Sequence, residues 1–554
     1  MSKTQKTAQA TEIEVDQDEE ILSDPLTDEL DNPELFFGLV GAIGTDLDKV
    51  YKILKKVLND LVGYRTEQIK LTEIISTEAD RKEPDRYQRY LKKMNAGTTV
   101  RKFYKRPDAV ILKGLSGVRA ARRRSNSNLT LGENEDPAEI PVDDIAFVFN
   151  SLKRPEEVDT LRRVYGQSFF LIGAYAPRES RVITLAKRIA DSRNKQNSEE
   201  FRPQAEELIE KDRADHGDRL GQAVQKTFPE ADIFINIDDE NKAQKEVSRF
   251  IRLIFGDAFF TPRREEQAMF LAKAAALRSA DLGRQVGAVI MSPEGDVVAI
   301  GTNEVPKAKG GQYWETDDPD QRDFQIKSDP NDKMRQKLIG DISSQLETNI
   351  RASVRKLIGE VKRSNVTDKQ VTDLVNKSVE QSQLASQIAQ SQMTNLIAYI
   401  RAVHAEMAAL MDAARRGISV RGNVLVCTTF PCHECARHII ASGISRVLYI
   451  EPYPKSLTTE LFPDSVVVDN PQSKDTFVHF LPFVGVAPRQ FMSLFDASRI
   501  ERKQAGDVIE WDAATARPRR SEAPQAYIFK ETRRLHFLDA YDRKNKPKKE
   551  NRHV

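Results

Sequence analysis

A histidine, a glutamate and two cysteines stand at spacings that suit metal chemistry. His404 and Glu406 are two residues apart in "RAVHAEMAAL", and Cys432 and Cys435 follow about thirty residues later in "CTTFPCHECA". Imidazole and thiolate groups are ligands that zinc prefers, and three of them plus water make a catalytic zinc site. Glu406 is too close to the histidine to be a co-ligand at the usual helical spacing. We therefore expect its carboxylate to move the proton of the activated water.

Other interpretations of these residues stay open. Cys432 and Cys435 could form a redox pair, but that leaves His404 and Glu406 without a role. A closed structural zinc site would need a fourth ligand, for which the neighbouring donors are Cys427, His433 and His438. Cys427 lies inside an apolar run, and we expect it to pack in the core.

The order of the four residues along the chain makes the prediction of a catalytic zinc site more specific. His-x-Glu followed by Pro-Cys-x-x-Cys is the signature of zinc nucleobase deaminases, in which the glutamate is not a ligand. Here it reads His404-Ala405-Glu406 and then Pro431-Cys432-His433-Glu434-Cys435. Either half alone is a weak signal, whereas the two in this order are a strong one. In such a site zinc lowers the pKa of water, and Glu406 would protonate N3 of cytosine and later its leaving amine.

The elements around these residues are predicted to form one α/β domain over 261–500. A helix at 264–280 precedes a hairpin, "QVGAVIMSPEGDVVAIGTN", whose two apolar runs flank a Pro-Glu-Gly-Asp turn. A polar helical insertion at 320–400 separates the hairpin from the helix that begins near His404. The strand "NVLVCTT", the helix "CHECARHIIASG" and the strand "RVLYIEPYP" complete the order.

The first half of the chain predicts a second α/β domain, over 33–256. Glu34 begins an apolar run that leads through a glycine turn into an amphipathic helix, and "AVILKGL" at 109–115 is predicted as a strand. Strands that alternate with helices predict a mainly parallel sheet covered on both faces. Residues 1–32 are acidic and predicted to be disordered. Residues 501–554 form a polar extension whose last 24 residues we expect to be a mobile basic tail.

Composition narrows the class of protein and its compartment. The chain has 39% hydrophobic and 31% charged residues, and its formal net charge is +1. No overall field therefore favours nucleic acid or an acidic membrane, and no apolar run reaches the length of a membrane span. All three cysteines fall within nine residues, which does not make a disulfide framework. We expect a cytoplasmic protein with no membrane partner.

The sequence also resembles a known family. "SADLGRQVGAVI", "GTNEVPKAKGGQYW" and "RAVHAEMAAL" are similar to the dCMP-deaminase branch of the cytidine deaminase superfamily. "GLVGAIGTDL", "FNSLKRPEEVDTLRRVYG", "IEPYPKSL" and "FVGVAPRQFMSLF" resemble the bacterial anti-phage dCTP deaminases. The resemblance covers about 33–500 and implies a P-loop-kinase-like domain fused to a zinc-dependent deaminase. The implied activity is conversion of dCTP to dUTP, and of dCMP to dUMP, which starves phage DNA synthesis.

By position, the resemblance implies a ligand set and a substrate set. His404, Cys432 and Cys435 would hold Zn²⁺ and Glu406 would be the proton shuttle. Asn303 matches a sugar-contacting asparagine, Arg284 and Lys307 could meet phosphates, and the substrate set also includes Ala405. Asn303 could equally cap a turn, and the two cations could be solvated surface charges.

The N-terminal glycine turn departs from a working P-loop. Thr45 and Asp46 stand where the motif requires Lys and Ser/Thr, and Asp46 would repel phosphate. The backbone amides of Gly41, Ala42, Ile43, Gly44 and Thr45 could still hold an anion at a helix start. We therefore predict a regulatory role, such as a nucleotide sensor, a docking surface or an inhibitory lid, beside a purely structural alternative.

Rival functions use the same site. A deaminase of single-stranded DNA or RNA would need a basic groove with stacking aromatics, and the Arg-rich segment 119–128 is expected to be a solvated loop instead. A binding protein with an inactive deaminase domain is disfavoured by Glu406. The family further implies a homo-oligomer, with 320–400 as a candidate interface, and a repressor that could be a small RNA or a protein.

Overall fold

The structure is a computed structural model of the 554-residue chain. It describes residues 32–130, 135–215, 218–360, 399–452, 456–470, 476–519 and 523–545, together with short pieces of 367–389. The acidic segment 1–31, most of 361–398 and the last nine residues lie outside the described residues. The prediction of a disordered N-terminus and the later part of the predicted helical insertion at 320–400 fall largely on those segments.

The N-terminal unit is built on a parallel sheet, as the alternation of strands and helices in the sequence predicts. Its strand order is β5-β4-β1-β3-β2. Its strands are β1 (Leu35–Val40), β2 (Arg65–Lys70), β3 (Ile145–Asn150), β4 (Phe169–Tyr175) and β5 (Ile233–Asn236). Every residue of β1 is buried, because Phe36 and Val40 enter one core and Phe37 and Leu39 the other. This two-sided burial explains its unbroken apolar run.

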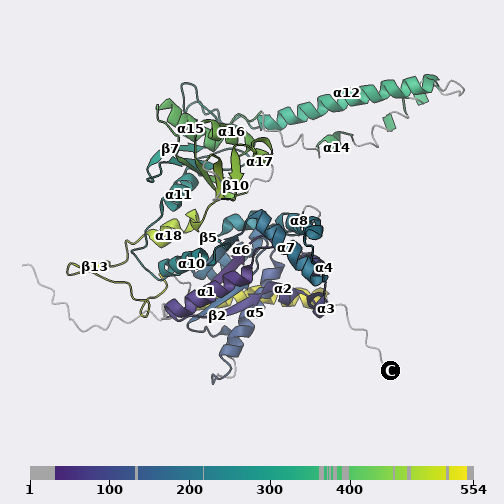
Figure 1. Cartoon of the computed structure of the whole chain (residues 1–554). Helices are drawn as coiled ribbons and strands as arrows, with labels where there is room; N and C mark the ends of the chain where they lie inside the picture. Colours follow the sequence, from purple (N-terminus) through teal and green to yellow (C-terminus); the bar gives the residue numbers. More distant parts are fainter. Residues whose placement is uncertain are drawn as a thin grey trace, which may run out of the picture.

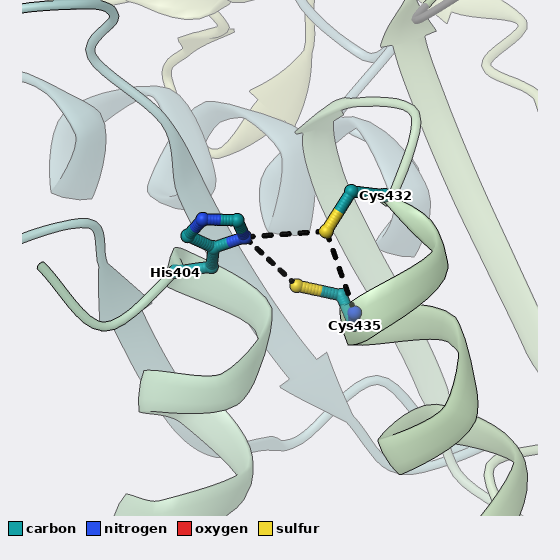
Figure 2. A group of neighbouring side chains, drawn as sticks. All are labelled: His404, Cys432 and Cys435. Atoms are coloured by element: carbon teal, nitrogen blue, oxygen red, sulfur yellow. Dashed lines mark hydrogen bonds between the residues drawn. The ribbon is translucent and has the colours of Figure 1, made fainter. Parts of the chain in front are cut away.

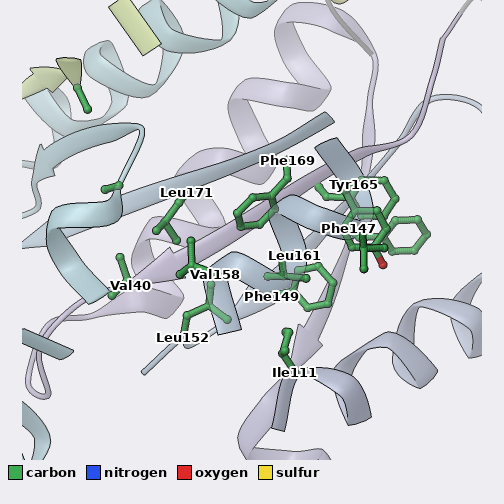
Figure 3. Close-up of a cluster of buried hydrophobic side chains, with 14 of the residues drawn as sticks. Val40, Ile111, Phe147, Phe149, Leu152, Val158, Leu161, Tyr165, Phe169 and Leu171 are labelled. Atoms are coloured by element: carbon green, nitrogen blue, oxygen red, sulfur yellow. The ribbon is translucent and has the colours of Figure 1, made fainter. Parts of the chain in front are cut away.

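Helices cover both faces of this sheet. They are α1 (Leu47–Val62), α2 (Leu71–Ile75), α3 (Glu78–Lys82), α4 (Arg86–Tyr104), α5 (Ala109–Ser125), α6 (Pro155–Tyr165), α7 (Arg178–Ser192), α8 (Arg202–Arg213), α9 (Val224–Thr227) and α10 (Glu240–Ile254). Figure 3 shows one core, in which Phe147 and Phe149 of β3 meet Leu161 and Tyr165 of α6.

Two sequence predictions are wrong at α5. The segment 109–115, predicted as a strand, forms the first turns of this helix, because Ile111, Leu115 and Val118 continue its buried face at spacings of four and three. The Arg-rich segment 119–128, predicted as a solvated loop, supplies the end of the same helix. Arg122 is fully buried there and donates to the carboxylates of Glu34 and Glu531.

The second unit contains a mixed sheet in the order β10-β11-β9-β8-β6-β7. Its strands are β6 (Gly287–Met291), β7 (Val297–Thr302), β8 (Val424–Thr429), β9 (Arg446–Glu451), β10 (Val466–Val468) and β11 (Val478–Pro482). The predicted hairpin is β6–β7, and its strand β6 runs antiparallel to both of its neighbours, β7 and β8. Its helices are α11 (Arg264–Ala276), α12 (Pro330–Glu360), α14 (Leu384–Ala389), α15 (Ala405–Arg415), α16 (His433–Ala441) and α17 (Thr458–Leu461). Figure 1 shows α12 projecting away from both units.

The chain after β11 returns to the N-terminal unit. β12 (Gly485–Val486) pairs antiparallel with β5, and the short α18 (Phe491–Phe495) follows it, before the two-residue strands β13 (Lys503–Gln504) and β14 (Asp507–Val508). The last helix, α19 (Pro524–Asn545), lies against α5 and α6, where Tyr527 is buried beside Phe36 and Tyr165. In Figure 1 this yellow helix lies among purple and blue elements. The expectation of a mobile tail over the last 24 residues is therefore wrong for 531–545, which belong to this helix.

A buried ion pair also joins the two units. Arg249 of α10 donates both terminal nitrogens to Glu266 of α11, at 2.7 and 2.8 Å. The same carboxylate accepts the amides of Arg263 and Val486, so its oxygens are satisfied although it is fully buried. A buried charge is tolerated when its partners are this complete.

Among the described residues, no helix is long and apolar enough to cross a membrane.

Candidate metal centre and its cavity

His404, Cys432 and Cys435 converge on one point. The Nδ1 atom of His404 lies 3.3 Å from the Sγ atom of each cysteine, and the three ligand atoms all lie within 4.8 Å of one another (Figure 2). A zinc ion bound tetrahedrally at its usual bond lengths holds nitrogen and sulfur about 3.6 Å apart. The donor set and its spacing therefore fit zinc.

Two helix starts bring these ligands together. His404 is the N-cap of α15, and Cys432 is the N-cap of α16. The Sγ atom of Cys432 accepts the backbone N–H of Cys435 at 3.4 Å, as a capping oxygen would. Because the positive end of the helix dipole faces the sulfur, this geometry favours a thiolate.

The three groups shift one another's pKa values. A hydrogen bond from Cys435 lowers the pKa of Cys432 to about 4, and His404 reinforces that shift against the effect of burial. Burial by itself lowers the pKa of His404, but the hydrogen bond and charge of Cys432 outweigh it and raise the pKa to about 9. The hydrogen bond with Cys432, together with burial, raises the pKa of Cys435.

Glu406 stands in the first turn of α15, next to the ligands. Its carboxyl is buried, and burial raises its pKa, with the charge of Cys432 acting in the same direction. The thiol of Cys435 acts to lower the pKa of Glu406, and Glu406 acts to raise the pKa of the Cys427 thiol. A buried carboxyl beside the ligand group can exchange protons with a bound substrate.

The proposed fourth ligands do not join the group. Among the residues that the structure describes, the metal-compatible cluster at this position holds His404, Cys432 and Cys435. Cys427 is buried on β8 in the core cluster of the unit, and burial raises the pKa of its thiol. The Nδ1 atom of His438 lies 2.7 Å from the carbonyl oxygen of Glu434 in its own helix. Three ligands leave a position for water.

A cavity of about 270 Å³ opens onto the ligands. Its lining includes His404, Glu406 and Cys432, with the predicted residues Asn303, Arg284 and Ala405. Asn303 also holds the loop before β6, because its side chain accepts the amide of Val286 and donates to the carbonyl of Arg284, each at 2.7 Å. The capping role and the lining role of this residue therefore coexist.

Sequence reasoning missed several walls of the cavity. Asp281 and Phe430 line it, and the Asp281 carboxylate accepts the amides of Gly283 and Arg284. The sequence position of Phe430, directly before Pro431 and Cys432, could have indicated that its ring lies near the metal ligands. Lys307, by contrast, lies in a separate cavity of about 920 Å³ over α11, β7 and α15, and pairs with Asp317. The structure does not bring it to the metal ligands.

The N-terminal glycine turn lies at the end of β1, where α1 begins. Gly41–Thr45 border a cavity of about 850 Å³ that several lysines and arginines also line. The amide of Ile43, expected to be free for an anion, donates to the buried carboxylate of Asp212 at 2.7 Å. Lys153 pairs with Asp212 at 2.8 Å, and Asp46 caps α1 by accepting the amide of Lys49. The carboxylate of Asp212 thus accepts one of the backbone amides that were predicted to hold an anion.

Comparison with known proteins bears on the second unit. Residues 262–451 match the family model of the "Cytidine and deoxycytidylate deaminase zinc-binding region". The matched region contains His404, Glu406, Cys432 and Cys435 and the hairpin before them. Zinc is the cofactor of such a region, and the His/Cys/Cys group is where this chain could hold it.

Individual relatives match shorter segments. The deoxycytidylate deaminase of Enterobacteria phage T2 is 43% identical over 54 residues, which are 10% of this chain and 29% of that protein. A probable deoxycytidylate deaminase of Drosophila melanogaster is 36% identical over 100 residues, which are 17% of this chain and 48% of that protein. The chain thus spans less than half the length of these curated relatives.

A solved structure gives a weaker likeness. The dCMP deaminase of cyanophage S-TIM5, in apo form, is 15% identical, and the comparison covers 40% of this chain and 99% of that one at a TM-score of 0.20. A score this low does not establish a shared fold.

Proposed function

We propose that the chain is a zinc-dependent deaminase of free deoxycytidine nucleotides. The observation that carries the proposal is the convergence of His404 with Cys432 and Cys435 beside the buried carboxyl of Glu406 on one cavity. The match of 262–451 to a deaminase family supports it. The reaction replaces the C4 amine of cytosine with oxygen from water and releases ammonia.

Each residue has a separate part in this reaction. His404, Cys432 and Cys435 would hold zinc, which supplies Lewis-acid activation of water. Glu406 accepts one proton from the water and passes it to N3 of the ring, and then accepts the second proton, from the oxygen bound to C4, and passes it to the leaving amine. Asn303 orients the sugar, and Arg284 at the exposed mouth of the cavity meets the phosphates.

Free nucleotides are preferred over a polynucleotide for a structural reason. The Arg-rich segment that could have bound nucleic acid ends a helix, and its side chains are paired: Arg119 with Asp136 and Glu139, Arg123 with Asp136, and Arg124 with Glu67. Paired arginines make a poor electrostatic track for a phosphate backbone.

One assay tests the proposal. The purified full-length protein is incubated with dCTP, dCMP, CTP, cytidine and single-stranded DNA, with and without a chelator, and uracil products are separated by chromatography. We expect dCTP and dCMP to be converted and the chelator to stop the reaction. Conversion of single-stranded DNA alone would overturn the proposal in favour of an editing enzyme.

We also propose that the activity serves antiviral defence in the cytoplasm by lowering dCTP during phage infection, with a regulatory nucleotide in the N-terminal cavity. The basic lining of that cavity supports the second part. Cells expressing the wild-type chain should lose dCTP and restrict phage, while Glu406→Gln cells should do neither. Equal plaque counts in both would contradict the defence role.

A further inference from the structure

Asp212 of α8 holds the position of an anion at the N-terminal glycine turn. Its Oδ2 atom accepts the amide of Ile43 at 2.7 Å, and its Oδ1 atom lies 2.8 Å from the Nζ atom of Lys153. Lys153 follows β3, and its Nζ atom also donates to the carbonyl of Gly41 at 3.3 Å. A backbone amide and an ammonium group on two oxygens are what a phosphate would receive at the start of a helix. The loop after β3 thus supplies the cation that the turn itself lacks.

One face of α4 lines the same cavity as the glycine turn. Its residues stand at spacings of three and four, which places them on one side of the helix: Arg86, Tyr90, Lys93, Gly97 and Arg101. Lys93 is half-buried, and no ion-pair partner of it occurs among the residues that the structure describes. Burial lowers the pKa of Lys93, and the charge of Arg89 acts in the same direction. A ligand that brings a negative charge would stabilise this ammonium group.

Buried polar atoms of the cavity wall lack partners. In the described part of the chain, the Nε atom of Arg101, the Oε1 atom of Gln222 and the Oγ1 atom of Thr45 have no hydrogen-bond partner. Arg101 is 2% exposed and Gln222 is 6% exposed, and all three residues line the cavity. Leaving such atoms unpaired is costly. A ligand with both acceptors and donors, such as the edge of a nucleobase, would satisfy them.

We propose that Asp212 is an internal substitute for the phosphate of a nucleotide that binds in the N-terminal cavity. The phosphate replaces the Asp212 carboxylate on the amide of Ile43 and on Lys153. Lys93 neutralises its remaining charge, and the base meets Arg101 and Gln222. Basic side chains outnumber acidic ones in the cavity wall even with Asp212 in place, so the cavity favours an anion. The inference rests on the proposed function, because it deepens the regulatory nucleotide named there and identifies the group that competes with it.

Asp212→Asn tests the competition. The amide keeps the size of the carboxylate but leaves Lys153 free of its negative partner. Isothermal titration of the full-length protein gives Kd values for inorganic phosphate, dAMP, dGMP, dTMP and ATP. None of these probes carries cytosine, so none is a substrate for the proposed deaminase site. We expect at least one of the nucleotides to bind Asp212→Asn about 10-fold more tightly than the wild-type protein. Glu210→Gln, on the same helix and paired at the surface with Arg213, should leave the Kd unchanged.

Two lysines test the placement of the ligand. Lys93→Ala should weaken nucleotide binding by about 10-fold, because it removes a cation from the cavity. Lys92→Ala is the matched control, since Lys92 pairs with Glu83 and does not line the cavity. Lys153→Met should also weaken binding, because the phosphate would lose its cation while Asp212 keeps the amide of Ile43. This variant tests the site at the glycine turn even if Asp212→Asn does not fold.

Three results would overturn the inference. An equal Kd in the wild-type protein and in Asp212→Asn removes the role of Asp212 as a competitor. Binding that neither Lys93→Ala nor Lys153→Met weakens places the ligand elsewhere. Binding of no probe to either protein means that water alone satisfies the buried polar atoms.

These measurements do not depend on turnover, so the two failures are distinguishable. A protein that deaminates no cytosine substrate but shows the expected Kd differences contradicts the deaminase function alone. An active deaminase without those differences contradicts the inference alone.

Discussion

Gly301 of β7 lies directly against the backbone of Ala405, the first residue of α15. A Cβ atom on Gly301 would lie 2.0 Å from the carbonyl oxygen of Ala405 and 2.4 Å from the amide nitrogen of Ala409. Because Ala405 stands between His404 and Glu406, this contact sets the height of both side chains above the sheet. The position of the metal ligands therefore depends on a residue without a side chain at position 301.

Gly301→Ala should displace the start of α15. Overpacking of this kind costs about 1–3 kcal/mol or more, and here the strain falls on the helix that carries His404 and Glu406. We expect zinc content, measured by elemental analysis, to fall together with deaminase activity. Gly340→Ala in the projecting helix α12 is the control, because its Cβ would have no atom within 4 Å. Normal zinc and activity in Gly301→Ala would contradict the packing argument.

Glu406→Gln should separate metal binding from turnover. The amide keeps the size of the carboxyl but cannot carry the proton, and loss of such a group costs about 10²- to 10⁴-fold in rate. Zinc content should stay at the wild-type level. Glu434→Gln, between the two cysteines but paired at the surface with Arg437, should retain most of the activity. An active Glu406→Gln enzyme would refute the assigned role.

Zinc binding should require His404, Cys432 and Cys435 but not Cys427. Cys435→Ala removes a ligand, so we expect it to lose zinc and activity, as does treatment of the wild-type protein with a chelator. Cys427→Ala removes only a packed thiol from the core and should keep its zinc. If both variants lost zinc equally in elemental analysis, a closed four-ligand site would be the better description.

Arg122→Met should destabilise the N-terminal unit. Arg122 is fully buried between Glu34 and Glu531, and its removal leaves two buried carboxylates without their cation. Breaking such a pair costs about 3–5 kcal/mol in the free energy of unfolding, which denaturant titration measures. Arg123→Ala breaks an exposed pair with Asp136 and should cost about 1 kcal/mol or less. Equal losses in the two variants would show that burial of Arg122 contributes nothing.

The sequence predicted the elements whose patterns are local. The fully apolar run of β1, the hairpin β6–β7 and the helix after His404 all follow from spacing and turn residues within a short window. The prediction of a strand at 109–115 was wrong because a short apolar run fits a strand and a buried helix equally well. Only the apolar residues beyond it, up to Val118, reveal the helical period.

The sequence by itself determined which groups can do chemistry here: an imidazole, two thiolates and a carboxyl in an order that fits zinc and proton transfer. Tertiary structure decided what lies around them. It separated Lys307 from the metal cavity, buried Arg122 under the C-terminal helix, and placed the Asp212 carboxylate where it accepts an amide of the glycine turn. These contacts join residues far apart in the chain, and their geometry depends on how whole layers pack rather than on any local pattern.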